Sequence, residues 1–564
     1  MAINIDISYK YKMAGEVEVE AAAIINDNYF DMNEPYPEYR KLDETVLRRM
    51  QSNDPSIASL QIDYSCRAEY FLEVEGVGRV IGDSTVLRRL KIFCHCQYQY
   101  FCLGWYEELF RGISRNRSIE VFELSVHPDL TPNFGFFRAL GPFFLHNSNL
   151  RYIRVSGALN KSLVSSLREC TSNSHLKCIE LTPKFKTDKE VVLYLDALHN
   201  IHKLVELNLY YDVTTGSRVC AALANLLDAS PFRTLSFGRL NDECIDILGR
   251  ALTMENNTLT SLRFKADRLT TTGLISLSSA LSHPNCRLEE LGLERASLGD
   301  DMVTLLGGKL MMTRTLKSLR FSGDNSITLT GWQSFSRCLS QITTFKELRL
   351  FGCDIDDVSA TVIVHGLIGN SSLNEIDMRD NPISIAWWES NFNMLLNCVP
   401  SLEELKLTAN DVNLDEGELV DDIMDWTDLL RTLCDASSID EIYSSNHTFH
   451  SIEIFRYIFA WTNHKIDGLL PDEIASLLRM NRSEDKHEVA RAKILKYYFA
   501  EGSANTLHAF SHMPLTSMPF ALEWIGRCGN ELSFMYNVAR QLPTLFEATS
   551  HKSKCSGAKR GRSE

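Results

Sequence analysis

The chain has 564 residues, of which 44% are hydrophobic and 23% charged, and its formal net charge is −15. These proportions suit a globular protein, but the length exceeds one compact core, so we expect several domains or one elongated array of repeats. The negative charge argues against general nucleic-acid or anionic-membrane binding, since both partners need a basic field. No run of 18 uninterrupted apolar residues occurs, so we expect no membrane-spanning helix.

The N-terminal region is acidic and of mixed composition. The start MAINIDISYKYKM has no apolar core typical of a secretory signal. We assign residues 1–60 to an acidic arm and residues 61–86 to an N-terminal cap of the repeats. The chain has 15 cysteines and no C-x-x-C pair, which favours reduced thiols in a cytoplasmic protein over a disulfide framework.

Two short motifs near residue 90 could bind a ligand. EGVGRVIG at 75–82 misses the dinucleotide-binding G-x-G-x-x-G pattern by one position, and we interpret it as a turn before the first strand. CHC at 94–96 lies near Cys102, but this spacing fits no ordinary zinc site. We therefore expect no metal, no cofactor and no catalytic residue, and we find no nucleophile elbow or catalytic triad.

A repeated frame, L-x-x-L-x-L, dominates residues 87–446. It is most regular over 259–430, where successive copies are 29, 28, 29, 28 and 29 residues apart. About 13 copies of a unit that varies from 26 to 37 residues predict a repeat array. The copies begin at Leu87, Ile119, Leu150, Leu176, Leu204, Phe232, Leu259, Leu288, Leu316, Phe345, Leu373 and Leu402, with a degenerate copy at Ile439.

Each copy has two halves with different hydrophobic periods. The first alternates, as in TLTSLRF, which predicts a strand. The second has helical spacing, as at Leu274, Leu277 and Leu281. Strand and helix repeated in one direction predict an α/β solenoid, a horseshoe with parallel strands on its concave face and helices outside.

The frame L-x-x-L-x-L-x-x-N/C-x-L resembles the ribonuclease-inhibitor class of leucine-rich repeats. Its last part is matched by Cys353 with Ile355, Asn381 with Ile383, and Asn410 with Val412. The resemblance implies that these Asn and Cys side chains satisfy backbone groups in the turn after the strand. Three segments, SNHTF (445–449), EVARAKILKYYF (488–499) and ALEWIG (521–526), also resemble the expanded, mostly uncharacterised leucine-rich repeat families of diatoms.

The polar strand positions form the predicted partner-binding surface. In the six regular copies they contain six acidic and six basic residues, so we expect an exposed face of mixed charge. Such a face selects a protein partner, or its charges simply pair in water. The candidate partner-binding residues, with two aromatic anchors from earlier copies, are Tyr152, Tyr210, Arg263, Lys265, Glu290, Glu294, Arg320, Glu347, Arg349, Phe351, Glu375, Asp377, Arg379, Glu404 and Lys406.

The C-terminal region has a different pattern. Helical stripes over 447–548 predict a helical cap in which the strand frame is lost, and 549–564 is a basic flexible tail that could serve nuclear import. We expect a non-catalytic scaffold that binds a protein partner of unknown identity. The alternative is a regulator of a small GTPase, similar to Ran GTPase-activating proteins, although the basic tail departs from their acidic one.

Overall fold

The structure is a computed structural model that describes residues 40–41, 44–64, 74–94, 109–126, 136–157, 161–169, 175–183, 185, 187–211, 213, 215–266, 269–323, 326–408, 425–459, 462–465 and 470–498. The chain divides into two compact units. The first comprises Met1–Gly366, Asp377–Pro382 and Arg456–His464, and the second comprises Leu367–Ile376, Ile383–Phe455 and Lys465–Glu564.

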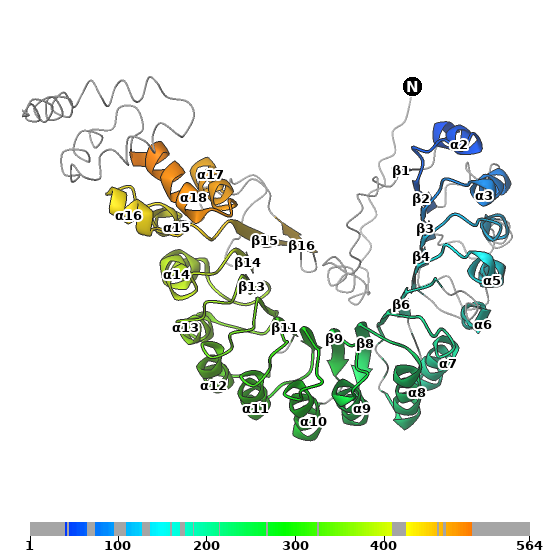
Figure 1. Ribbon diagram of the computed structural model, residues 1–564, viewed down its shortest axis with the longest axis horizontal. Coiled ribbons are helices and arrows are strands. Elements are labelled where there is room, and N and C mark those ends of the chain that lie inside the picture. Colours follow the sequence, from blue (N-terminus) through cyan, green and yellow to red (C-terminus); the bar gives the residue numbers. More distant parts are fainter. Residues whose placement is uncertain are drawn as a thin grey trace, which may run out of the picture. The chain divides into compact units, whose positions relative to one another are not determined.

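Parallel strands in chain order form one layer of the first unit (Figure 1). Each pairs in parallel with its predecessor and successor without a change of order. The strands are β1 (Arg40–Lys41), β2 (Ser59–Tyr64), β3 (Arg89–Cys94), β4 (Val121–Val126), β5 (Tyr152–Gly157), β6 (Cys178–Pro183), β7 (Glu206–Leu209), β8 (Thr234–Leu240), β9 (Ser261–Ala266), β10 (Glu290–Glu294), β11 (Ser318–Ser322) and β12 (Glu347–Phe351).

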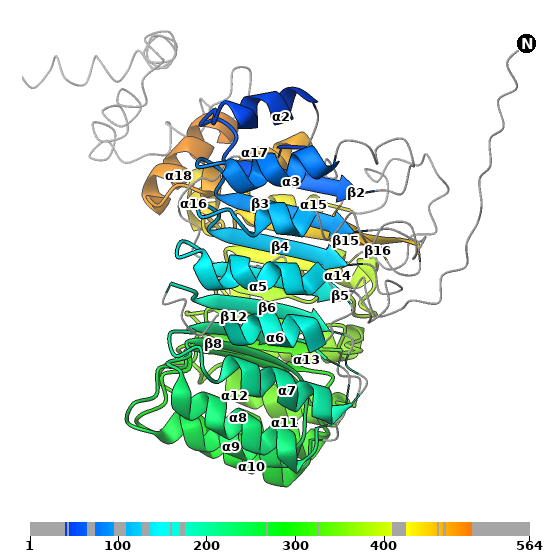
Figure 2. The ribbon, with the colours of Figure 1, turned by 90° about the vertical axis from the view of Figure 1, so that its right-hand side faces the viewer.

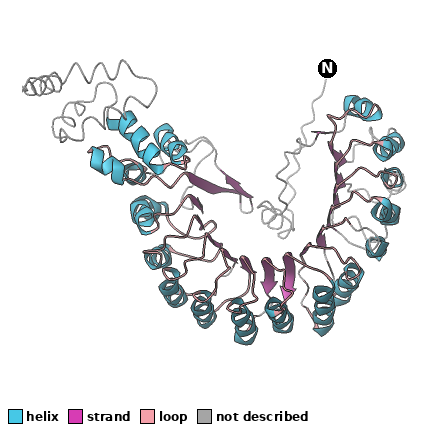
Figure 3. Cartoon of the chain, viewed as in Figure 1, coloured by secondary structure: helices cyan, strands magenta, loops and turns pink. Residues whose placement is uncertain are grey.

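Helices form the other layer of this unit, all on one side of the strands (Figures 2 and 3). Neighbouring helices pack on one another, as α9 does on α10 and α11 on α12. The helices are α2 (Glu44–Gln51), α3 (Val74–Asp83), α5 (Phe136–His146), α6 (Lys161–Glu169), α7 (Asp188–Leu198), α8 (Ser217–Ala229), α9 (Asp242–Thr253), α10 (Thr271–Leu281), α11 (Asp300–Leu310), α12 (Leu329–Leu339) and α13 (Asp357–Gly366).

The leucine frame places each strand. From Leu87 to Leu402 every strand begins two residues after the first apolar residue of its copy. In β9 the frame residues Leu259, Leu262 and Phe264 are all buried, because alternate strand side chains point towards the helices. The intervening side chains point to the opposite side of the sheet, and we call this side the polar face.

The expected cap and turn at 61–86 are corrected by the structure. An additional frame copy begins at Ile57, before β2, and β1 with α2 precedes that copy. Strand–helix alternation therefore begins at β1, within the segment 1–60 that was expected to be an acidic arm. The segment EGVGRVIG lies within helix α3 and is not a turn. Val77, Val80 and Ile81 have helical spacing and are buried. Its glycines suit close helix packing, since a Cβ at Gly112 would lie 2.6 Å from the Cα of Gly78.

The second unit continues the same alternation. β14 (Glu404–Thr408) pairs in parallel with β15 (Ser451–Phe459), and the helices are α14 (Ile385–Cys398), α15 (Thr427–Leu433), α16 (Ile439–Ser444), α17 (Asp472–Asn481) and α18 (Lys486–Lys493). A π-helical turn, Ile494–Tyr498, follows α18. β13 (Glu375–Asp377) and β16 (Thr462–Lys465) each contain residues of both units.

The prediction of a degenerate frame copy at Ile439 is wrong. Ile439 begins helix α16, and the last frame copy starts instead at Phe449, two residues before β15. The strand frame therefore extends into the region expected to be a helical cap. Asn446 marks this copy, since its Oδ1 accepts hydrogen bonds from the backbone N–H groups of Thr448 (2.9 Å) and Phe449 (2.8 Å).

A buried lysine ties helix α18 to this turn. Lys493 Nζ donates to the carbonyls of Leu433 (2.6 Å) and Asn446 (2.8 Å) and lies 3.1 Å from Nδ1 of His447. Nε2 of His447 lies 3.2 Å from the carbonyl of Tyr443, which requires Nε2–H as the donor and leaves Nδ1 as the acceptor. Burial, followed by the neighbouring Lys493 charge, lowers the pKa of His447 to about 4.

We expect acid to loosen the second unit through His447. The folded pKa lies below the ordinary histidine pKa of 6.5, so the stabilisation from neutral His447 is complete above that pH and is lost as pH falls towards 4. After solvent screening the loss is about 1–2 kcal/mol. The free energy of unfolding, measured by denaturation at pH 7 and at pH 4.5, should differ less between the two pH values for His447→Gln than for the wild type. Other effects of acid are common to both proteins. Equal differences would contradict this role.

A recurring side-chain contact links the start of α9 to the start of α10, and the start of α11 to the start of α12. Asp242 accepts hydrogen bonds from the backbone N–H and the hydroxyl of Thr270, which caps α10. Asp300 makes the same two contacts with Thr328 at the start of α12. A Cβ on the glycine three residues after either threonine would collide with the aspartate carboxylate. These contacts recur two repeats apart, in agreement with the alternation of 28 and 29 residues.

Helix packing in the first unit depends on Gly366. A Cβ there would lie 2.5 Å from both Cβ and the carbonyl oxygen of Ser336 in the preceding helix, whereas one at Gly308 would meet nothing within 4 Å. We expect Gly366→Ala to lower the free energy of unfolding by about 1–3 kcal/mol. Gly308→Ala, in the interior of α11, should be neutral or stabilising by up to about 1 kcal/mol. Urea denaturation of both variants tests this, and equal midpoints would contradict the close packing.

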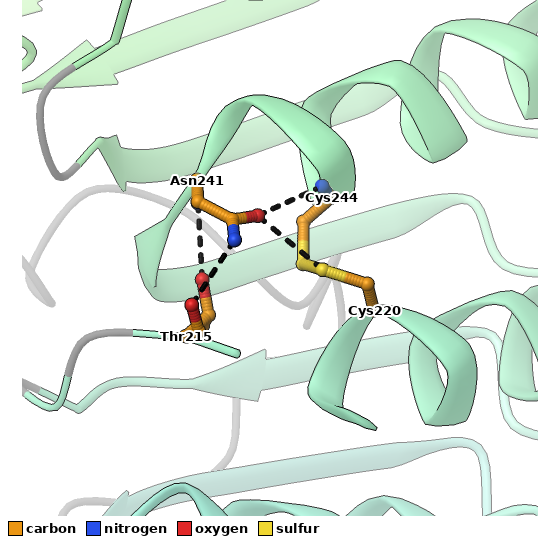
Figure 4. The surroundings of a disulfide bond; sticks show 4 residues. All are labelled: Thr215, Cys220, Asn241 and Cys244. Atoms are coloured by element: carbon orange, nitrogen blue, oxygen red, sulfur yellow. Dashed lines mark hydrogen bonds between the residues drawn. A yellow bond between two sulfur atoms is a disulfide. The ribbon is translucent and has the colours of Figure 1, made fainter. Parts of the chain in front are cut away.

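Cys220 and Cys244 form a disulfide that joins α8 to α9 (Figure 4). Both cysteines are fully buried. Asn241 caps α9 beside the disulfide, where its Oδ1 accepts the Cys244 N–H (3.0 Å) and its Nδ2 donates to the Thr215 carbonyl (3.0 Å). The expectation of reduced thiols throughout the chain is therefore wrong at this pair.

Several sequence predictions lie outside the described residues. These are the acidic arm before residue 40, Asn410 with Val412, the segment ALEWIG, the cap from 499 onwards and the basic tail at 549–564.

Candidate functional site

The polar face carries a row of cross-strand charges. In a parallel sheet, residues in register on neighbouring strands are about 5 Å apart, so long side chains meet. The third strand positions of β3 to β6 are in register and alternate in sign: Lys91, Glu123, Arg154 and Glu180. The ion-pair distances along this row are 3.7, 3.9 and 3.0 Å.

Tyr152, the first residue of β5, contacts this row of charges through Glu180. Its hydroxyl donates to Oε2 of Glu180 at 2.7 Å. Burial raises the pKa of Glu180, an effect opposed by the Arg154 charge and by the Tyr152 hydrogen bond. Burial also raises the pKa of Tyr210 to about 12. The two tyrosines predicted as aromatic anchors are thus embedded in the polar network of the sheet.

The regular copies pair their charges differently. Arg263 on β9 donates through Nε to Oε1 of Glu290 on β10 at 2.7 Å. Ser261 donates to the other oxygen of Glu290 at 2.8 Å. Further along, Arg349 on β12 lies 3.2 Å from Glu347 of its own strand. These arginines are therefore held in place by their carboxylate neighbours.

A second paired group follows β12. Arg379 makes two hydrogen bonds with Asp377, at 2.9 and 2.7 Å, and its guanidinium lies 5.6 Å from the ring centroid of Phe351. Asp377 is almost fully buried. In the second unit, Lys406 Nζ forms an ion pair with Glu375 at 3.0 Å.

Arg320 and Glu294 differ from the other charged residues. Neither makes a hydrogen bond or ion pair with the described residues, and Nε of Arg320 and Oε1 of Glu294 are buried without a partner. Arg320 is 7% exposed and Glu294 is 3% exposed. Burial lowers the pKa of Arg320. The charge of Glu294 opposes this effect and raises the pKa, whereas the charges of Arg263 and Arg349 lower it.

The predicted site residues lie on the expected strand face, but their exposure was predicted wrongly. Arg263, Arg320 and Arg349 are each less than one-tenth exposed. Their side chains lie along the sheet against residues of neighbouring strands, which removes them from water. Lys265 is the penultimate residue of β9 and Glu404 is the first residue of β14, and both are partly exposed.

The predicted site residues did not include Lys91, Glu123, Arg154 and Glu180. The predicted charges all come from the six regular copies, whereas these four residues belong to irregular ones. They could have been found from the frame alone, because each lies four residues after the first apolar residue of its copy.

The described part of the chain contains neither clustered metal ligands nor a helix that could span a membrane. No group of three or more His, Cys, Asp or Glu side chains there is close enough to hold a metal ion. Cys94 ends β3, and the other residues of the CHC motif lie outside the described residues. Among the described helices, none combines the length and apolar character needed to cross a bilayer.

Comparisons with known proteins match only part of the chain. No protein-family model matches it. A stretch of 124 residues is 30% identical to the ribonuclease inhibitor of Mus musculus, covering 22% of this chain and 27% of that protein. Another of 174 residues is 26% identical to NACHT, LRR and PYD domains-containing protein 2 of Homo sapiens, covering 31% and 16%. The chain thus spans about a quarter or less of the length of these relatives.

Solved structures show a distant likeness. A chain in the yeast complex of Rad7 and Elc1 has 14% identity and a TM-score of 0.39, covering 66% of this chain and 90% of that one.

The parallel strands, alternating helices and leucine frame define an α/β leucine-rich repeat solenoid. Together with the relatives, they identify a leucine-rich repeat protein of the ribonuclease-inhibitor type. The resemblance to diatom families stays a prediction.

Proposed function

We propose that the protein is a non-catalytic scaffold that binds a protein partner through the polar face. The observation that carries this proposal is the cross-strand pairing of charges on that face, from Lys91 through Glu180 and again at Arg263 with Glu290. Side chains held by neighbours lose little conformational entropy when a partner docks. Fixed charges of both signs also favour one complementary partner over others.

The relatives support the same class of function. Ribonuclease inhibitor is named for its action on another protein, and leucine-rich repeats underlie that similarity. A repeat sheet offers many side chains from successive strands in fixed register, which suits recognition of a folded surface.

The test exchanges the two residues of one ion pair, so that neither charge is left without a partner. Single reversal at Arg263 would leave a carboxylate facing another, and breaking a buried pair costs about 3–5 kcal/mol. The double variant Arg263→Glu/Glu290→Arg keeps the pair but inverts its orientation. The matched control is Asp246→Arg/Arg250→Asp on helix α9, an exposed pair 3.1 Å apart.

Affinity capture from native extract compares these two variants with the wild type. We expect a partner that is retained by the helix variant and lost by the polar-face variant, with both variants folded by circular dichroism. If both variants retain the partner, the partner binds outside this part of the polar face. Stimulation of GTP hydrolysis by a captured GTPase would instead favour the regulator alternative.

A further inference from the structure

The polar face has an excess of positive charge at one place. In β9 to β12 the third positions in register are Arg263, Gly292, Arg320 and Arg349, with no carboxylate among them. The corresponding positions of β3 to β6 alternate in sign. The regular copies therefore depart from the charge balance that the earlier copies show.

Two of these three arginines obtain carboxylates from the first strand position. Arg263 pairs with Glu290 and Arg349 with Glu347. For Arg320 the residue equivalent to Glu290 is Glu347, the first residue of the next strand. Glu347 is held instead by Arg349 and by the Ser318 hydroxyl, which donates to its Oε2 at 2.9 Å.

The remaining nearby acids, Glu294 and Asp377, attract Arg320 but form no ion pair with it in the described structure. The carboxylate of Asp377 accepts two hydrogen bonds from the guanidinium of Arg379. Glu294 lies in register with Ser322, two residues along the strand from the level of Arg320, and no ion pair joins the two in the described structure. Arginine stays protonated in proteins, so this side chain is a desolvated cation without a bonded counter-ion.

We infer that Arg320 is the receptor for a single carboxylate carried by the protein partner, on an Asp or Glu side chain at the tip of a protruding segment. A guanidinium binds a carboxylate through two parallel hydrogen bonds, which gives both energy and orientation. Because Arg320 is only 7% exposed, a side-chain tip fits and a flat surface does not. The unpaired Glu294 nearby repels a run of acidic residues and so favours one carboxylate over several. This inference rests on the proposed function of the polar face.

A first experiment needs no ligand and compares thermal unfolding of Arg320→Gln and Arg263→Gln in the full chain. Removing a buried cation that has no bonded partner should raise the midpoint, whereas removing the partner of Glu290 should lower it. A lower midpoint for Arg320→Gln would show that the guanidinium is a structural cation, which would overturn the inference.

A second experiment uses a phage-displayed library of disulfide-closed random peptides, selected on the wild-type chain. We expect binding loops to share an Asp or Glu whose amide replacement weakens binding at least about tenfold, or about 1.4 kcal/mol. The same loops should bind Arg320→Gln at least about tenfold more weakly. Arg250→Gln, on the exposed face of α9, should bind them as the wild type does.

The outcomes separate this inference from the proposed function. Loops that bind Arg320→Gln normally but fail on Arg263→Glu/Glu290→Arg would leave the polar face as the binding surface and overturn the role of Arg320. Loops affected by neither would count against both. Loops that need Arg320 but contain no essential carboxylate would overturn the proposed ligand chemistry.

Discussion

Asn381→Ala is expected to lower the free energy of unfolding of the first unit by about 3 kcal/mol or more. Oδ1 of Asn381 accepts the backbone N–H groups of Cys353 (2.8 Å) and Ile355 (3.1 Å). Its Nδ2 donates to the carbonyls of Leu350, Met378 and Arg379 at 2.6–3.1 Å. Asn381 is 2% exposed, so water cannot replace these bonds after truncation.

The matched control is Asn374→Ala. The side chain of Asn374 donates a hydrogen bond to Oε1 of Glu403 at 3.1 Å, at a partly buried site. We expect a loss of about 0–1 kcal/mol there, in keeping with a single polar contact near solvent. Denaturant unfolding monitored by circular dichroism should separate the two variants clearly. Similar losses would mean that the asparagine after β13 does not organise the turn.

The role of Asn381 was predicted from the resemblance to ribonuclease-inhibitor-type leucine-rich repeats. The asparagine follows the strand frame at a constant offset, and the structure confirms that its side chain satisfies backbone groups of the turn. Local spacing placed the strands from Leu87 to Leu402, since alternation along a strand leaves only one set of side chains that can be buried.

The error at Ile439 has a simple physical origin. Ile439 and Ile442 are three residues apart, which fits both the leucine frame and one face of a helix. The frame's third apolar position falls on Ser444, whereas the copy at Phe449 has Ile452 and Ile454 in place. Requiring all three apolar positions would have found the correct copy.

An asparagine three residues before the frame is a further signal. Asn116 before Ile119, and Asn370 before Leu373, accept the backbone N–H of the frame residue at 2.9 and 3.1 Å. Asn446 before Phe449 repeats this arrangement. The motif SNHTF is therefore explained by turn chemistry common to several copies.

Only part of the candidate site could be predicted from the sequence. Strand alternation identified which charged residues share a face, but the burial of that face depends on side-chain directions across strands. Arg263 and Arg320 occupy equivalent positions in their copies, yet one is paired and the other is not. The difference lies in the first residue of the next strand: Glu290 pairs with Arg263, whereas the equivalent Glu347 pairs with Arg349 of its own strand, and this becomes visible only when the register is known.

The disulfide is the feature with the second large expected effect. Cys220 and Cys244 are 24 residues apart, and closing a loop of that length restricts the unfolded chain by about 3 kcal/mol at 25 °C. We therefore expect Cys220→Ala/Cys244→Ala to lower the free energy of unfolding by about 2–4 kcal/mol in non-reducing buffer. Non-reducing peptide mass spectrometry should recover the two cysteines in one cross-linked fragment.

A reductant separates the effect of the disulfide from that of the lost side chains. Dithiothreitol should destabilise the wild type towards the double variant and leave the double variant unchanged. Cys398→Ser, at a partly exposed cysteine of the second unit, should keep the full response to reductant. If wild type and double variant unfold alike without reductant, the two thiols are reduced in solution, and the packing of α8 against α9 is held by Asn241 and its contacts with Thr215.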